Sequence, residues 1–228
     1  MKLDLSLFDK NSKQIISKTY SFLEKELKKK SLSPAHKIDH YERVFNLAMR
    51  IIKKEKRRAD PLIVGVAALL HDIGELRSFK SKMKHVDISV KIARKVLREL
   101  NFPSNKVKDV IYAIETHSFT KGHIKPKTFE AQVLQDADRL DALGAIGLAR
   151  CLMPAGVWDR ALYNPKDPFA KKRKLNDIKY TIDHFFTKLL KLPSLMNTKT
   201  GRKIARRRVK ILKEFLKELR KELKECGI

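Results

Sequence analysis

The chain has 228 residues, of which 43% are hydrophobic, and its 52 Lys and Arg against 26 Asp and Glu give a formal net charge of +26. This length and hydrophobic content suit one large domain with a substantial core better than two small domains. No apolar run approaches the roughly 18 residues that span a bilayer, the N-terminus lacks a secretion signal, and two cysteines provide no disulfide framework, so we expect a cytoplasmic protein without a membrane partner.

The N-terminal part of the chain is predicted to form two amphipathic helices. Apolar residues at helical spacing predict a helix over residues 10–30 and another over about 39–57, with a break at 31–36 between them. On the second helix, His40 falls on the same face as the apolar residues. His40 is therefore expected to point into the core.

The next predicted helix is apolar nearly all round and ends in two polar residues. Asp60 and Pro61 form an N-cap followed by proline, which predicts a helix start. A helix with no polar face favours a central, buried position. It runs into the sequence HDIG, where His71 and Asp72 are adjacent and Gly74 is placed to terminate the helix.

Three further predicted helices also carry polar groups on an apolar face. In each helix the polar residue lies at helical spacing from apolar residues and so shares their face, as His40 does. Their ranges and inward polar residues are 85–100 with His85, 106–117 with His117, and 129–153 with Asp138 and Asp141.

The remainder of the chain is predicted to be a mobile segment followed by two helices. Residues 153–176 are basic and rich in proline, which indicates a flexible, lid-like segment. No strand-like alternation occurs, so the fold class is all-α, with residues 1–228 forming a single-domain helical bundle. We expect a core at about 33–150, on which the helices in 177–228 pack.

Polar groups thus occupy inward faces in five separate segments of the predicted bundle. A single buried histidine is more often a hydrogen-bonded core residue than a ligand, whereas a buried carboxylate needs a partner or a metal. Imidazole nitrogens and carboxylate oxygens together form the mixed ligand set of a divalent transition metal. Convergence from five segments therefore predicts a metal site, in which His71 and Asp72 bind one ion from a helix end.

The segments DHYERV, LLHDIG and DADRLDA together resemble the HD-domain superfamily of metal-dependent phosphohydrolases, whose pattern is H…HD…D on an all-α helical bundle. The sequence QDADRLDALGAIGLAR is similar to a narrower group of small stand-alone HD hydrolases. By position, the resemblance implies that the metal ligands are His40, His71, Asp72 and Asp138. It also implies a divalent ion, which would be Mn, Co, Ni, Zn, Fe or Mg.

His85 and His117 resemble the additional histidines of binuclear superfamily members, which include cyclic dinucleotide phosphodiesterases and di-iron oxygenases. The chain lacks the GYP signature, and Ser118 stands where the phosphodiesterases have a second histidine. We therefore expect one firmly bound metal and a possible second one, with His85 and His117 binding substrate phosphate. A di-iron oxygenase is the alternative within the superfamily.

The resemblance implies a hydrolase in which metal-activated water attacks the phosphorus of a phosphate ester, a nucleotide or a related small phosphorylated metabolite. Glu75 is the candidate base or water-orienting group, against the alternative of a solvated carboxylate near a helix end. Asp141 is a second candidate catalytic group, which would orient a ligand imidazole or pair with Arg139 or Arg43.

Three side chains outside the ligand set are candidates for binding the substrate phosphate. Arg43 follows His40 by one helical turn and could clamp a phosphate through two hydrogen bonds, or form a surface salt bridge. His184 and Lys188 are one turn apart and could both contact phosphate, or simply be core and surface residues. The sequence leaves these alternatives open.

The charge of +26 has three interpretations. It could steer a small anionic substrate, bind nucleic acid through the basic C-terminal helix, or reflect a thermophile-like surface rich in Lys and poor in Gln. No zinc-finger or RNP signature appears, and the aromatic residues are not interleaved with the basic ones. We therefore expect a small anionic phosphorylated partner; nucleic acid is not favoured, and a homo-oligomer is possible.

Overall fold

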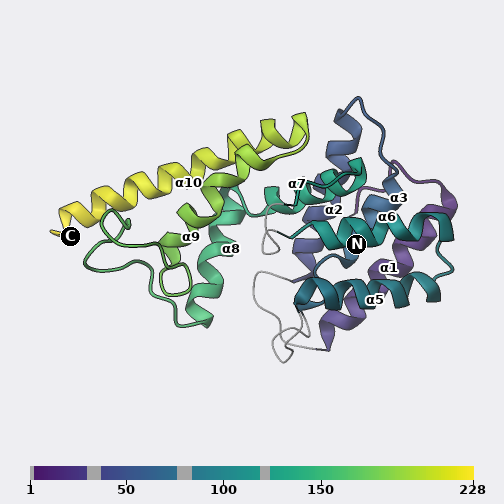
Figure 1. Ribbon diagram of the computed structural model, residues 1–228, viewed down its shortest axis with the longest axis horizontal. Coiled ribbons are helices and arrows are strands. Elements are labelled where there is room, and N and C mark those ends of the chain that lie inside the picture. The colour runs from purple at the N-terminus through teal and green to yellow at the C-terminus, as the bar shows by residue number, and fades with distance from the viewer. Residues whose placement is uncertain (1–2, 30–36, 76–83, 119–123) are drawn as a thin grey trace. The chain divides into compact units, whose positions relative to one another are not determined.

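The structure, a computed structural model, describes residues 3–29, 37–75, 84–118 and 124–228 (Figure 1). Within these ranges every regular element is a helix, and the one β-bridge, between Ala161 and Tyr180, belongs to no strand. The all-α prediction is therefore confirmed. The predicted break at 31–36 lies outside the described residues.

Contacts divide the described residues into two compact units. The first contains the residues up to Asp138 together with Asn197–Gly201, and the second contains Arg139–Met196 and Arg202–Ile228. The single-domain organisation, with residues 177–228 packing on the core at about 33–150, stays a prediction.

The first unit is built around helix α3. Its helices are α1 Lys10–Lys28, α2 Ile38–Lys54, α3 Pro61–Leu70, α5 His85–Glu99, α6 Ser104–Thr116 and most of α7 Phe129–Asp141. Helix α3 packs against α1, α2 and α6, and every residue from Leu62 to Leu70 is buried. Its start is the predicted one, because the Asp60 carboxylate accepts a hydrogen bond of 2.9 Å from the Leu62 N–H. Helix α3 is thus the central helix that its composition predicts.

The single helix predicted over residues 129–153 is wrong. Helix α7 ends at Asp141, and a separate helix, α8, covers Gly144–Val157. Gly144 has a φ of 80°, which ends helical geometry and which residues with a side chain rarely adopt. A Cβ at Gly144 would also lie 3.2 Å from the Cγ atom of Arg208. The chain therefore changes direction here in a way that suits glycine.

The second unit contains helix α8, the short helix α9 Thr181–Thr187, a 3-10 helix at Leu189–Leu195 and most of α10 Lys199–Glu225. The irregular segment begins later than the predicted residue 153, because α8 continues through Pro154 to Val157. Proline removes only one backbone donor from a helix that is about to end.

The segment between α8 and α9 is held by its own hydrogen bonds. The Asp167 carboxylate accepts bonds of 2.9 and 2.8 Å from the backbone N–H groups of Lys171 and Lys172. The two nitrogens of the Arg173 guanidinium donate to the two oxygens of the buried Asp183 carboxylate, at 2.6 and 2.7 Å. This bidentate pair fastens the basic run to α9.

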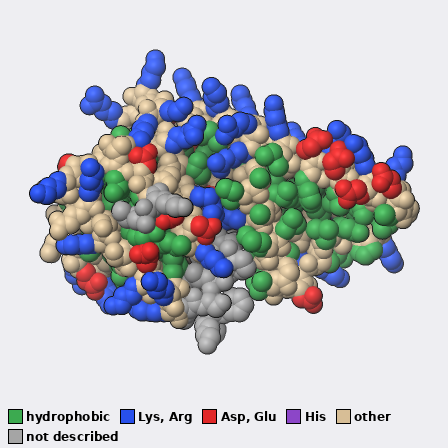
Figure 2. All heavy atoms as spheres, turned by 180° about the vertical axis from the view of Figure 1, so that it is seen from behind, with side chains coloured by type: hydrophobic (Ala, Val, Ile, Leu, Met, Phe, Trp, Pro, Cys, Tyr) green, Lys and Arg blue, Asp and Glu red, His purple; other side chains and the backbone are tan. Residues whose placement is uncertain are grey.

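The second unit carries most of the exposed large hydrophobic side chains of the described residues. Figure 2 shows hydrophobic side chains gathered on one face of this unit. Ile146, Met153 and Val157 lie along α8 and are 42, 46 and 65% exposed. No single helix in the described ranges is long and apolar enough to span a membrane; by length and composition, only α7 and α8 taken together across their bend pass that test.

Candidate metal centre

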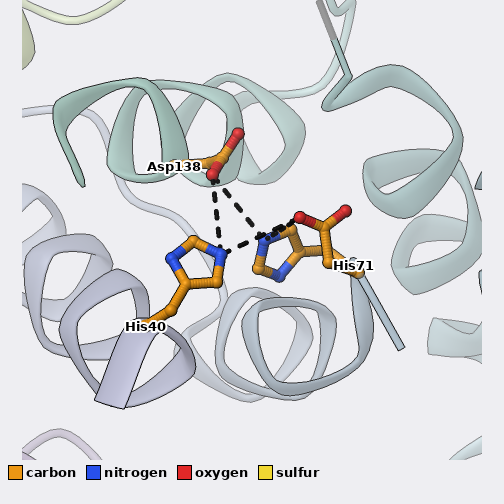
Figure 3. Close-up of side chains that lie close together, drawn as sticks. His40, His71 and Asp138 are labelled. Carbon is orange, nitrogen blue, oxygen red and sulfur yellow. Dashed lines mark ion pairs between the residues drawn. The ribbon is translucent and has the colours of Figure 1, made fainter. Parts of the chain in front are cut away.

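Four side chains from three elements of the first unit converge on one point. Figure 3 shows three of them, His40 from α2, His71 from the end of α3 and Asp138 from α7; the fourth, Asp72, directly follows His71. Each offers one ligand atom, and these four atoms lie within 4.8 Å of one another. The Nε2 atom of His71 lies 3.5 Å from Asp72 and 3.8 Å from Asp138. The structure thus brings together the four ligands that the resemblance implies.

The distances around His40 are similarly too long for hydrogen bonds. Its Nε2 atom lies 3.8 Å from the Oδ2 atom of Asp72 and 3.9 Å from the Oδ1 atom of Asp138. Hydrogen bonds between such atoms are usually 2.7–3.2 Å long. The site thus contains two buried imidazoles and two carboxylates around a common centre, at nitrogen–oxygen distances of 3.5–3.9 Å. This arrangement fits a divalent ion that is bound by nitrogen and oxygen ligands.

The orientation of two imidazoles is set by helix ends. His71 is the residue directly after α3, and its Nδ1 donates to the carbonyl oxygen of Ala68 at 2.9 Å. His117 directly follows α6, and its Nδ1 donates to the carbonyl oxygen of Ile114 at 2.6 Å. The last carbonyls of a helix lack partners within the helix, so each histidine satisfies one of them. The Nε2 atom of His71 is buried without a hydrogen-bond partner among the described residues and is thus left to bind a ligand, whereas that of His117 lies 3.0 Å from the Oδ1 atom of Asp72.

The electrostatics of the centre favour a positive charge. Burial by itself would raise the pKa of the Asp72 and Asp138 carboxyls, but His71 lowers both below their ordinary range. Burial by itself would lower the pKa of His71, yet the two carboxylates raise it to about 9. A buried site that holds a proton this firmly is one in which a cation can replace that proton.

Asp72 also belongs to a second cluster. Its Oδ1 atom lies 3.0 Å from the Nε2 atom of His117 and 3.7 Å from that of His85, which begins α5. Its other oxygen, Oδ2, is the one that lies near His40 and His71. The three side chains could hold an ion of their own. Asp72 is therefore placed to bridge two positions, and its carboxylate is shared by every histidine of the centre.

Glu75 lies beside this second cluster. Its Oε1 atom is 3.1 Å from the Nδ1 atom of His85, and its side chain is 29% exposed. The carboxylate thus contacts both solvent and an imidazole that reaches Asp72. Its role as a base stays a prediction.

Gly74 allows the HDIG turn to lie directly against α5. The Gly74 N–H donates to the Oγ atom of the buried Ser89 at 2.9 Å. A Cβ added at Gly74 would lie 2.0 Å from the carbonyl oxygen of His85, well inside a van der Waals contact. The absent side chain therefore allows the turn that carries Asp72 to lie close to the start of α5.

We expect Gly74→Ala to lower the free energy of unfolding by about 1–3 kcal/mol, because overpacking forces the backbone of α5 away from the turn. Urea denaturation measures this change. Gly156→Ala is the matched control, since a Cβ there meets nothing within 4 Å on an exposed part of α8, and it should unfold at the urea concentration of the wild type or above. Equal stability of the two variants would contradict the close approach at Gly74.

Arg43 and Asp141 have ionic partners in the structure. Arg43 pairs with Asp39 one turn earlier on α2, which is the surface salt bridge considered above. Asp141 is fully buried and accepts a hydrogen bond of 2.8 Å from Arg150, a partner that the sequence analysis did not name. A substrate role for Arg43 and a catalytic role for Asp141 stay predictions.

His184 and Lys188 both belong to the second unit. The Nδ1 atom of His184 lies 3.0 Å from a carboxylate oxygen of Asp177, and the backbone N–H of Lys188 donates to the carbonyl oxygen of His184. Their contact with a substrate phosphate stays a prediction.

Sequence reasoning missed the buried carboxylate of Asp136. It accepts four hydrogen bonds of 2.7–3.0 Å, from the backbone N–H and side chain of Asn197 and from those of Thr198. Burial raises the pKa of this carboxyl, although the four donors oppose that shift. The sequence carries only a weak signal for this carboxylate, because Asp136 lies among other polar residues of α7, two residues before Asp138 and so on a different face. Asp136 fixes the start of α10 to α7.

Residues 38–143 match the family model of the HD domain. The uncharacterized protein YpgQ of Bacillus subtilis (strain 168) is 35% identical over 194 residues, which are 84% of this chain and 86% of YpgQ. The structure of YpgQ in complex with ADP has a TM-score of 0.70 and 31% identity, and the match covers 93% of this chain and 96% of that one.

Two further solved structures are similar over nearly the whole chain. An HD-superfamily hydrolase from Bacillus thuringiensis has a TM-score of 0.72 and 30% identity, with 93% of this chain and 98% of that one covered. A protein from Lactobacillus plantarum has a TM-score of 0.74 and 28% identity, with the same shares covered.

Proposed function

The chain belongs to the HD-domain family, and on that premise we propose that it is a metal-dependent phosphohydrolase acting on a nucleotide or a related small phosphorylated metabolite. The observation that carries the proposal is the convergence of His40, His71, Asp72 and Asp138 within 4.8 Å. The complex of YpgQ with ADP supports a nucleotide, because the two chains match over more than nine-tenths of their lengths.

The four ligands would hold one divalent ion, with His85 and His117 beside it. A divalent ion in such a site polarises a phosphoryl oxygen and lowers the pKa of water toward neutrality. Glu75 accepts the proton of the attacking water, and His85, at 3.1 Å from the Glu75 carboxylate, keeps that carboxylate in place. The water oxygen would form the new bond to phosphorus as the bond to the leaving oxygen breaks, and the leaving oxygen would take up the proton that Glu75 accepted or one from solvent. His117 orients the Asp72 carboxylate through their hydrogen bond of 3.0 Å.

The proposal is tested by metal analysis and a phosphate-release screen. Purified protein is assayed for phosphate release from nucleoside mono-, di- and triphosphates with added Mn, Co, Ni, Zn or Mg. We expect release that depends on one or more of these metals and that disappears in His71→Ala. Metal-free protein that hydrolyses the substrate as fast as the metal-loaded form would rule the proposal out.

We expect His117→Ala to raise KM or lower kcat while about one metal per chain is retained, because metal ligation and substrate positioning are separate tasks. His117 lies in the second cluster, whereas the first cluster of four ligands does not include it. Elemental analysis and steady-state kinetics measure the two properties separately.

The opposite result would favour the oxygenase alternative. That result is two equivalents of iron in the wild type, one of them lost in His117→Ala, together with oxygen consumption by the two-iron form. Glu115→Ala is a suitable control, because Glu115 lies in the last turn of α6, two residues before His117.

A further inference from the structure

Helix α10, drawn in yellow in Figure 1, carries a continuous row of basic side chains on one face. Residues three or four apart lie on the same face of a helix, and seven Lys and Arg residues of α10 follow one another at these spacings. All seven are exposed and belong to the second unit. We call this set the basic stripe; its members are Lys203, Arg206, Lys210, Lys213, Lys217, Lys221 and Lys224.

The basic stripe is long and contains no acidic residue. At a rise of 1.5 Å per residue it extends over about 32 Å, with one cation about every 5 Å. At 100° per residue its members fall within an arc of about 80°, and every glutamate of α10 lies to one side of that arc. The glutamates of α10 are Glu214, Glu218, Glu222 and Glu225.

The N-terminal half of the basic stripe is not neutralised by neighbouring carboxylates. In the C-terminal half, Lys217 lies 3.2 Å from Glu214 and Lys221 lies 2.8 Å from Glu218. The four members of the stripe before Lys217 form no ion pair with a residue that the structure describes. Their positive charge is therefore available to an anion from outside the chain.

The face of α10 opposite the basic stripe is already used by the fold. Ala205 and Leu212 are fully buried there, and Val209, Leu216 and Leu219 are at most 9% exposed. These contacts direct the stripe toward solvent. They also leave α10 no apolar face with which to enter a bilayer, as an amphipathic membrane helix does.

We propose that the basic stripe binds the phosphodiester backbone of a nucleic-acid duplex. Double-stranded DNA carries one negative charge per about 1.7 Å of its axis, so every cation of the stripe has a phosphate to face. A small phosphorylated metabolite, in contrast, contacts one or two cations of a row this long. Backbone contacts position a protein without reading the bases, and they need none of the aromatic platforms on which single-stranded bases stack. We therefore expect binding without sequence preference.

The test uses a fluorescently labelled duplex of about 25 base pairs and arbitrary sequence, whose anisotropy is followed as the full chain is added at several salt concentrations. We expect a Kd of about 1–100 µM at physiological salt. The logarithm of the association constant should fall with the logarithm of the salt concentration with a slope of roughly −4 to −6, because about five to seven phosphates release their counterions.

The triple variant Lys203→Gln, Lys210→Gln and Lys213→Gln tests the stripe directly. It should raise the Kd roughly tenfold or more and make the salt slope shallower by about 3, because each lost phosphate contact contributes about 1. Glutamine and lysine have similar helix propensities, so circular dichroism should show an unchanged helical content.

The matched control is the triple variant Lys13→Gln, Lys18→Gln and Lys25→Gln. These three lysines are exposed on α1 of the first unit, so the control loses the same charge from a different helix. Its Kd and salt slope should stay close to those of the wild type. Equal weakening in the two triple variants would show that net charge alone attracts the duplex, and would overturn the proposal.

Two further measurements separate the basic stripe from the metal centre and from a lipid surface. Asp72→Asn should bind the duplex with the wild-type Kd, because the proposal does not depend on the proposed function; loss of binding in this variant would overturn it. Vesicles of phosphatidylcholine with about one third phosphatidylserine offer anionic charge without a nucleic acid. Binding to the vesicles without salt-dependent binding to the duplex would assign the stripe to a membrane surface and likewise overturn the proposal.

Discussion

Asp72→Asn is expected to remove the bound metal and to lower phosphate release by roughly a thousandfold or more. This loss exceeds the roughly 10–100-fold effect of removing a hydrogen-bond partner of a metal ligand. Asp72 has this importance because its Oδ2 atom lies 3.5 Å from His71 and its Oδ1 atom 3.0 Å from His117. A neutral amide supplies neither the charge nor the second acceptor oxygen.

The measurement combines elemental analysis, circular dichroism and a phosphate-release assay. The helical signal should be retained, because α3 ends before Asp72. Asp159→Asn is the matched control: Asp159 is exposed and has a φ of 48°, a conformation that Asn adopts readily. Full activity in an Asp72→Asn protein that contains no metal would contradict the proposed function.

Asp136→Ala is expected to lower the free energy of unfolding by about 4 kcal/mol, because it removes the common acceptor of four hydrogen bonds from buried or half-buried donors of Asn197 and Thr198. For a chain of this size the melting temperature should fall by roughly 8–16 °C. Differential scanning calorimetry measures the change. The melting temperature of Asp136→Asn should lie between those of the wild type and Asp136→Ala, since the amide oxygen of asparagine still accepts hydrogen bonds.

Asp109→Ala provides the control for this experiment. Asp109 is half-exposed on α6, and alanine favours the helix there, so little change in melting temperature is expected. If Asp136→Ala had the same melting temperature as the wild type, the four hydrogen bonds would contribute no net stability. Other contacts would then hold the start of α10.

The inward position of His40, His71 and Asp72 could be predicted because its signal is local. His40 shares a face with apolar residues on its own helix, and His71 and Asp72 directly follow a helix with no polar side. A side chain in such a position has to point inward whatever the arrangement of the other helices. The resemblance to a known family then added which of these inward side chains lie together in one site.

The features that were missed depend on residues far away in the chain. The apolar residues of ALGAIG continue the helical spacing of α7, and the break before α8 becomes evident only with the positive φ of Gly144 and the side chain of Arg208. Asp136 likewise finds its donors at residues 197 and 198. Helical spacing within α7 contains no information on such partners.

The hydrogen bonds from the Nδ1 atoms of His71 and His117 to helix carbonyls have a consequence for the entropy of metal binding. A free imidazole loses rotational freedom, and must select one tautomer, when an ion binds it. Here both restrictions are already imposed by folding, so the free energy of binding an ion at His71, or at a second position beside His117, would not be reduced by ordering these two rings. The entropy of ordering the rings is instead lost when the chain folds. The folded chain without an ion therefore already holds its ring nitrogens and carboxylates close together.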